Sequence, residues 1–130
     1  RAKLVDQMGG LASDAVIAGE NQEHLTALLV PDLGRLSKIA APGTPAEAVL
    51  DDPAVRDAVA EKLAGHVKTA GGSSGRVTAV MLMKEPLDLD KGEVTDKGSV
   101  NQRAVLRHRA DLVERLYAED DPDVIRPKGR

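Results

Sequence analysis

Cysteine, phenylalanine and tryptophan are absent from the sequence, and tyrosine occurs once. Without cysteine the chain can form neither disulfides nor thiolate metal sites, which is compatible with a reducing cytosol. The near absence of aromatic rings leaves nucleobases almost nothing to stack on. The net charge of -3 also opposes binding to a phosphate backbone, which needs a cationic surface. We therefore expect no nucleic-acid partner.

Long apolar runs are missing as well, so the sequence predicts no membrane span and no signal peptide. Its 130 residues suit one domain with a single core. Apolar residues make up 42% and charged residues 30%, a balance typical of globular proteins. We expect a cytoplasmic domain with no membrane partner.

Three short apolar runs, bounded by polar residues or glycine, have the length of buried strands: residues 14–19, 25–31 and 76–83. The polar residues between the first two runs predict a hairpin. The third run is apolar on alternate and intervening positions alike, which predicts a central strand that is covered on both faces.

Helical patterns occupy the remaining regular stretches: residues 2–8, 32–40, 52–70 and 99–117. Asp52 and Pro53 are a favoured helix start, and Ser99 with Gln102 fits a capping box. Since strands and helices do not alternate regularly, we predict an α+β fold, a small sheet of about three strands covered by helices. The charged tail, residues 119–130, is expected to be loose.

An acidic loop raises the possibility of a calcium site, because Asp88, Asp90 and Glu93 lie close together. A calcium loop that starts at Asp88 needs glycine at its sixth position, where Glu93 stands, while Gly92 comes one residue early. This mismatch favours a solvated acidic loop.

Other candidate sites are better explained without a ligand. The glycine-rich residues 68–76 lack a P-loop ending and read as a helix-to-strand connector. The histidines show no metal-ligand spacing and are expected on the surface or on helix flanks, so we expect no metal site. A basic cluster on the last helix is expected to be a solvated face. The histidines are His24, His66 and His108, and the cluster contains Arg103, Arg107, His108 and Arg109.

The stretch KGEVTDKGSVNQR, residues 91–103, is the most suggestive part of the sequence. Gly92 and Gly98 permit backbone conformations that could present a side chain at an edge. Lys97 precedes a predicted helix N-terminus, which attracts anions, and a lysine there could add a charge for a phosphate or carboxylate. Taken alone, the pattern is a weak signal, because an exposed loop lysine usually serves only solubility.

The same stretch resembles a known family. GEVTDKGSVNQRAVL, residues 92–106, together with the preceding GGSSGRVTAVMLMKEP and the following HRADLVERLYAEDDP, is similar to the C-terminal subdomain of feruloyl-CoA synthetases. These enzymes belong to the adenylate-forming superfamily of acyl-CoA synthetases, luciferases and peptide-synthetase adenylation domains. SDAVIAGENQEHLTALLVPD, residues 13–32, resembles the first strand pair of that subdomain.

The resemblance implies a site. In this superfamily a large N-terminal domain binds ATP and the carboxylic acid, and a small lid closes over them with a lysine before it rotates for thioester formation. By this match Lys97 is the adenylation lysine, and Lys91, Thr95, Gly98 and Arg103 are possible nucleotide or CoA contacts. Asp96 stands where the superfamily usually has glycine, and Val100 stands where it usually has arginine.

The implied protein is an AMP-forming feruloyl- or hydroxycinnamoyl-CoA ligase that uses ATP, Mg²⁺ and CoA. Residues 1–118 would be its lid and residues 119–130 a tail, with the N-terminal adenylation domain of the same chain as partner. We expect Arg1 to lie near the hinge between the domains, and the piece alone to be inactive and to hold no tightly bound cofactor. Two alternatives stay open: a stand-alone α+β binding module with an anion-contacting loop, or a synthetase for another carboxylic acid.

Overall fold

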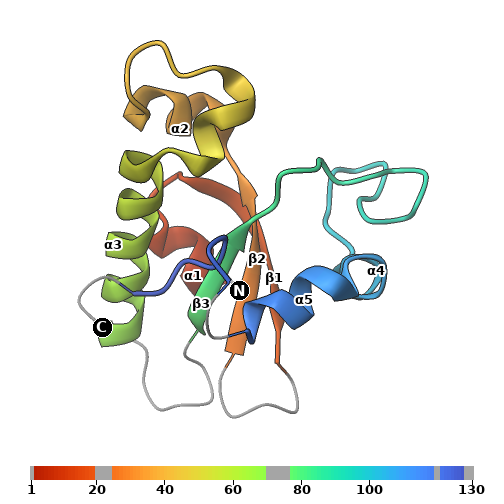
Figure 1. The fold of residues 1–130 in the computed structure, drawn as a ribbon. Coiled ribbons are helices and arrows are strands. Elements are labelled where there is room, and N and C mark those ends of the chain that lie inside the picture. Colours follow the sequence, from red (N-terminus) through yellow and green to blue (C-terminus); the bar gives the residue numbers. More distant parts are fainter. Residues whose placement is uncertain (1, 20–24, 70–76, 119–120, 128–130) are drawn as a thin grey trace.

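The computed structural model describes residues 2–19, 25–69, 77–118 and 121–127 (Figure 1). Its strands are β1 (Ala12–Ala18), β2 (Leu25–Pro31) and β3 (Val77–Leu82). Its helices are α1 (Ala2–Gln7), α2 (Leu33–Ile39), the 3₁₀ helix η1 (Ala46–Asp51), α3 (Pro53–Thr69), α4 (Gln102–His108) and α5 (Ala110–Leu116). The predicted strand runs and the α+β class are confirmed. Within the described ranges, no helix has the length and apolar character needed to span a membrane.

The three strands form one mixed sheet in the order β1-β2-β3. β1 and β2 are antiparallel, as the hairpin prediction requires, whereas β2 and β3 are parallel. The prediction that the third run is the central strand is wrong, because β2 holds that place. β3 is apolar on both faces because helices cover the sheet above and below, and not because β3 has a neighbouring strand on each side.

Helices cover both faces of the sheet (Figure 1). The first face packs against α1, α2, η1 and α3 around buried residues such as Leu4, Leu36, Val59 and Leu63. The second face packs against α4 and α5 and includes Val105 and Leu116. The sheet is therefore the middle layer of three.

A bulge at Thr78 decides which residues of β3 face each layer. Leu25 pairs with Val77, but the next residue, Thr26, pairs with Ala79. The extra residue resets the alternation, so that Val77 and Val80 share the first face. Ala79, Met81 and Met83 lie on the second face.

α3 begins where the sequence predicts. The Asp52 carboxylate accepts hydrogen bonds from the backbone N–H groups of Ala54 and Val55, at 2.8 and 3.4 Å. It also accepts from the N–H of Ala41, at 3.2 Å, which ties the preceding connection to the helix start. These bonds, with that from Ala41 the largest cause, lower the pKa of Asp52 below its ordinary value.

His66, on α3, is buried, which corrects the prediction that the histidines lie on the surface or a helix flank. Its Nε2 accepts a hydrogen bond from the Val77 N–H at 3.1 Å, and its Nδ1 lies 2.6 Å from Gln7 Oε1. Because Nε2 accepts, the proton sits on Nδ1 and is donated to Gln7. The ring thus joins α3 to α1 and to the first residue of β3. His108 is exposed, and His24 lies outside the described residues.

The predicted last helix is two helices, because the chain breaks at Arg109, with φ -115° and ψ 33°. The capping-box prediction is also wrong. Asn101 is the N-cap, and its side chain accepts from the Ala104 N–H at 3.2 Å. Gln102 instead reaches β1, where it accepts from the Ile17 N–H at 3.2 Å and donates to the Ala15 carbonyl at 2.9 Å.

The C-terminal stretch packs on the domain over residues 121–127, contrary to the expectation of a loose tail. Ile125 and Val80 exchange two backbone hydrogen bonds, of 2.7 and 2.9 Å. Val124 and Ile125 are both buried, one against each face of the sheet. The many charges of this stretch led to the wrong expectation, because two apolar residues among them pack into the core.

Candidate functional site

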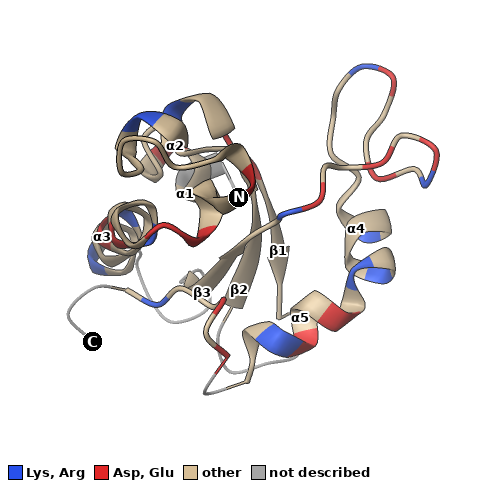
Figure 2. Ribbon diagram, turned by 45° about the horizontal axis from the view of Figure 1, so that its top comes forward, with Lys and Arg blue, Asp and Glu red and all other residues tan. Residues whose placement is uncertain are grey.

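The loop between β3 and α4 projects away from the sheet and carries acidic and basic segments along its length (Figure 2). Its far part is a tight hairpin in which Val94 and Val100 form an isolated bridge. The Gly98 N–H donates to the Thr95 carbonyl at 2.9 Å, and the Thr95 N–H donates to the Ser99 carbonyl at 2.8 Å. Gly98 has φ +84°, a conformation that side-chain-bearing residues rarely adopt.

Lys97 lies in this turn and is exposed. Thr95 makes a third hydrogen bond within the turn, because its hydroxyl accepts from the Ser99 N–H at 3.1 Å. The structure therefore brings Thr95, Lys97 and Gly98 into one element. The helix N-terminus comes later in the chain than expected, because Asn101 is the N-cap of α4 and the helix begins only at Gln102.

The two other predicted contacts lie on separate elements. Lys91 is exposed in an earlier turn, where the Gly92 N–H donates to the Leu89 carbonyl at 3.0 Å. Arg103 is exposed on the first turn of α4. All the proposed cations thus face solvent, but only Lys97 is held in a turn closed by both a threonine and a glycine.

Sequence reasoning missed a buried ion pair at the base of the loop. Glu93 is 2% exposed, and its carboxylate accepts from Arg109 Nε at 2.9 Å and Nη2 at 3.0 Å. The Arg109 guanidinium is the main cause that holds the pKa of Glu93 below its ordinary value. Glu93 is therefore not part of a solvated acidic loop, and Arg109 is not part of a solvated basic face.

A sequence signal for this pair did exist. Arg109 falls on the apolar stripe of the last helical pattern, four residues after Val105 and seven before Leu116, both of which are buried. A charged side chain at a buried position requires a partner of opposite charge. The partner itself could not be chosen from the sequence, because several acids precede Arg109.

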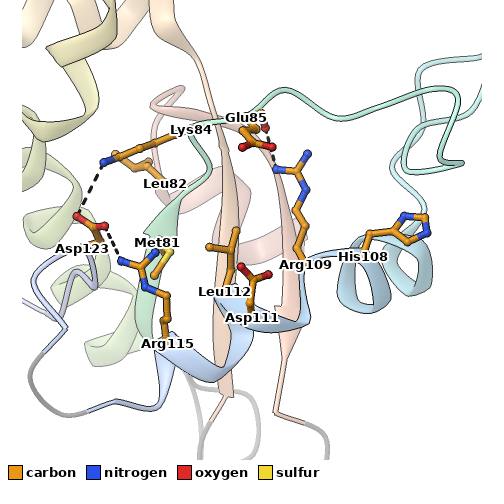
Figure 3. Close-up of a pocket in the computed structure, with 10 residues that line it drawn as sticks. All are labelled: Met81, Leu82, Lys84, Glu85, His108, Arg109, Asp111, Leu112, Arg115 and Asp123. Carbon is orange, nitrogen blue, oxygen red and sulfur yellow. Dashed lines mark hydrogen bonds and ion pairs between the residues drawn. The ribbon is translucent and has the colours of Figure 1, made fainter.

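A cavity of about 420 Å³ lies beside this pair, between β3, α5 and the C-terminal stretch (Figure 3). Two of the cations that line it, Lys84 and Arg115, form ion pairs. Lys84 lies 3.0 Å from Asp51, and Arg115 lies 2.7 Å from Asp121 and 2.6 Å from Asp123. Arg115 is also the main cause of the lowered pKa of Asp121. The ion pairs of Arg115 with Asp121 and Asp123 therefore help to fasten the C-terminal stretch to α5.

Among the described residues, no group of three or more histidine or acidic side chains could hold a metal ion. The chemistry open to the loop is the electrostatic action of a mobile ammonium.

Solved structures define the class of the fold. The chain matches the A-PCP didomain of carboxylic acid reductase from Segniliparus rugosus, in complex with AMP, with a TM-score of 0.63 and 21% identity over 91% of this chain and 16% of that chain. It also matches the A domain of that enzyme, in complex with AMP and a co-purified carboxylic acid, with a TM-score of 0.56 and 19% identity over 90% of this chain and 18% of that chain. The chain therefore has an α+β fold that occurs within adenylate-forming enzymes.

Sequence similarity points the same way. The chain is 28% identical over 112 residues to Long-chain-fatty-acid--CoA ligase 4 of Saccharomyces cerevisiae. The matched region covers 81% of this chain. It spans 16% of the length of that ligase. No protein-family model matches the chain. The chain thus has the fold of a domain found in the carboxylic acid reductase structures, and it is similar in sequence to part of a long-chain-fatty-acid--CoA ligase.

Proposed function

We propose that the chain is the lid subdomain of an AMP-forming acyl-CoA synthetase, with residues 1–118 as the lid and Lys97 as its adenylation lysine. The observation that carries the proposal is the placement of Lys97 at an exposed turn on a projecting loop, within a domain of the fold described above. Thr95 and Gly98 close that turn, which gives the lysine a defined base from which to extend.

A lysine in this position has a clear electrostatic task. During adenylation a carboxylate oxygen of the acid bonds to the α-phosphorus of ATP, and pyrophosphate leaves. Two anions must approach each other, so a positioned ammonium lowers their repulsion and stabilises the charge of the transition state. This effect is strong only when water is excluded, which closure of a lid would achieve.

The proposal places ATP and the acid on an adenylation domain of the same chain, and the cavity described above, which Lys97 does not line, plays no part in it. Mg²⁺ would neutralise phosphate charge on that domain. CoA would enter after the lid has rotated and withdrawn the lysine loop. The 130-residue chain alone is expected to catalyse no ATP–pyrophosphate exchange, and measurable exchange by it would contradict the lid assignment.

The acid that we propose is a hydroxycinnamic acid such as ferulate. The support is the resemblance of residues 92–106 to feruloyl-CoA synthetases, whereas the relative from Saccharomyces cerevisiae is described as a long-chain-fatty-acid ligase. The complete enzyme should be assayed for AMP release with CoA and hydroxycinnamic, benzoic or long-chain fatty acids. Preferred turnover of a fatty acid would replace the hydroxycinnamate proposal without affecting the role of Lys97.

The role of Lys97 is tested with Lys97→Ala in the enzyme that contains the adenylation domain. We expect acyl-adenylate formation to fall by about 100-fold or more, the size of effect seen when one transition-state donor is removed. Thioester formation from preformed acyl-adenylate should be nearly unchanged, because the loop is withdrawn in that step.

Lys91→Ala is the matched control, since it removes a second exposed lysine from the same loop. We expect it to change adenylation by less than about threefold, the range of an exposed charge. A large loss of adenylation in Lys91→Ala with none in Lys97→Ala would transfer the role to Lys91. Equal losses in both half-reactions for Lys97→Ala would contradict the proposed function.

A further inference from the structure

Arg109 holds both arms of the lysine loop at once. On the outgoing arm its guanidinium donates to the carbonyls of Glu85 and Pro86, each at 2.8 Å. On the returning arm it makes two hydrogen bonds to the carboxylate of Glu93. Figure 3 shows the guanidinium directed at Glu85, away from the other charged residues of the cavity. One side chain thus closes the base of the loop.

Glu93 passes this restraint on to the backbone. Its carboxylate accepts from the Asp88 N–H at 3.0 Å, and its own N–H donates to the Asp88 carbonyl at 3.0 Å. Its carbonyl accepts from the Asn101 N–H at 2.9 Å. Glu93 is therefore fixed through its side chain, its N–H and its carbonyl, and the hairpin that carries Lys97 begins at the next residue.

A simple contribution to stability does not account for this arrangement. A buried ion pair contributes little net stability compared with apolar residues of similar volume, because both charges lose their hydration. A guanidinium that makes several charge-assisted hydrogen bonds in one plane instead fixes the direction and distance of the groups it binds. The interruption of the helix at Arg109 also sacrifices regular structure at the residue that makes these contacts.

We infer that the Glu93–Arg109 pair positions the adenylation lysine, an inference that rests on the proposed function of Lys97. Neither residue touches the reactants in this scheme. The pair fixes the position of the base of the hairpin relative to the domain, and the hairpin in turn fixes the position of the Lys97 ammonium. Since a displacement of about 1 Å can cost on the order of 100-fold in rate, a loosened base should slow adenylation even when the fold is intact.

The central experiment compares Arg109→Lys with Arg107→Lys in the complete enzyme. Lysine keeps the charge at position 109 but cannot bind Glu93 and two carbonyls in one plane. Arg107 is exposed on α4, two residues earlier, so its substitution makes the same chemical change where the structure assigns no positioning contact. We expect Arg109→Lys to lower the adenylation rate by about 10- to 100-fold, and Arg107→Lys to change it by less than about twofold.

A double-mutant cycle separates positioning from a general structural role. In a Lys97→Ala background, Arg109→Lys should lower adenylation by less than about twofold further, because no lysine remains to be positioned. Thioester formation from preformed adenylate should be unaffected in all variants. An effect of Arg109→Lys that is equal in both backgrounds, or equal in both half-reactions, would overturn the inference.

Glu93→Gln is the second variant if Arg109→Lys does not fold, since glutamine keeps the shape and one acceptor of the carboxylate. We expect the same dependence on Lys97 with a smaller loss, on the order of 10-fold. A loss that persists in the Lys97→Ala background overturns the positioning role alone. The proposed function fails separately, and the inference with it, if Lys97→Ala leaves adenylation unchanged.

Discussion

Ile125→Ala tests whether the C-terminal stretch belongs to the folded domain. Ile125 is 4% exposed and lies in the core on the same face as Val80 and Leu82. The substitution keeps both backbone bonds to Val80 and removes only three side-chain carbons, whose burial is worth about 0.8 kcal/mol each. Adding the cavity left behind gives a loss of about 3 kcal/mol in the free energy of unfolding.

The assay is urea or thermal unfolding of the 130-residue chain. A loss of about 3 kcal/mol should lower the Tm by about 10 °C in a domain of this size. Leu89→Ala is the control, because Leu89 is 58% exposed on the loop, and it should cost less than about 0.5 kcal/mol. If Ile125→Ala is as mild as the control, the stretch does not pack on the sheet, and the original expectation of a loose tail is right.

Two further predictions concern α3. His66→Ala should lower the free energy of unfolding by about 2 kcal/mol, because the buried Val77 N–H loses its acceptor. Urea unfolding measures this loss, with the exposed Lys68→Ala as the control. A loss no larger than that of the control would contradict the prediction. The folded pKa of Asp52 lies below its ordinary value of 3.8, so its stabilisation is present above that pH and fades as the pH falls further. Asp52→Asn keeps the cap but removes this titration, so its stability should fall less than that of the wild type between roughly pH 4 and 2; parallel acid unfolding curves would refute the argument.

Local patterns were sufficient where short-range chemistry decides the structure. Asp52 and Pro53 predicted the start of α3, and the observed bounds of β2 match the apolar run 25–31. These features depend on residues within a few positions of one another. The exposure of Lys97 in a glycine-closed turn followed from the same kind of signal.

Long-range pairing was beyond the reach of these patterns. Arg109, where the helix breaks, binds Glu93, 16 residues earlier, and the buried His66 binds Gln7, 59 residues away. The position of β3 at the edge of the sheet depends on how β2 and β3 pair across the intervening helices. In each case the sequence supplied one partner, and only the fold identified the other.

Gln102 and Ile125 each bind backbone groups at one of the two edges of the sheet. The side-chain amide of Gln102 hydrogen-bonds the N–H of Ile17 and the carbonyl of Ala15 on the free side of β1. The backbone of Ile125 hydrogen-bonds the N–H and the carbonyl of Val80 on β3. A strand from another molecule needs an unbroken row of such groups to pair with an edge. Both edges are interrupted in the middle, so the domain is protected against association by strand addition. In its proposed role as a lid, the domain would close on a partner domain and separate from it without exposing an edge on which copies could polymerise.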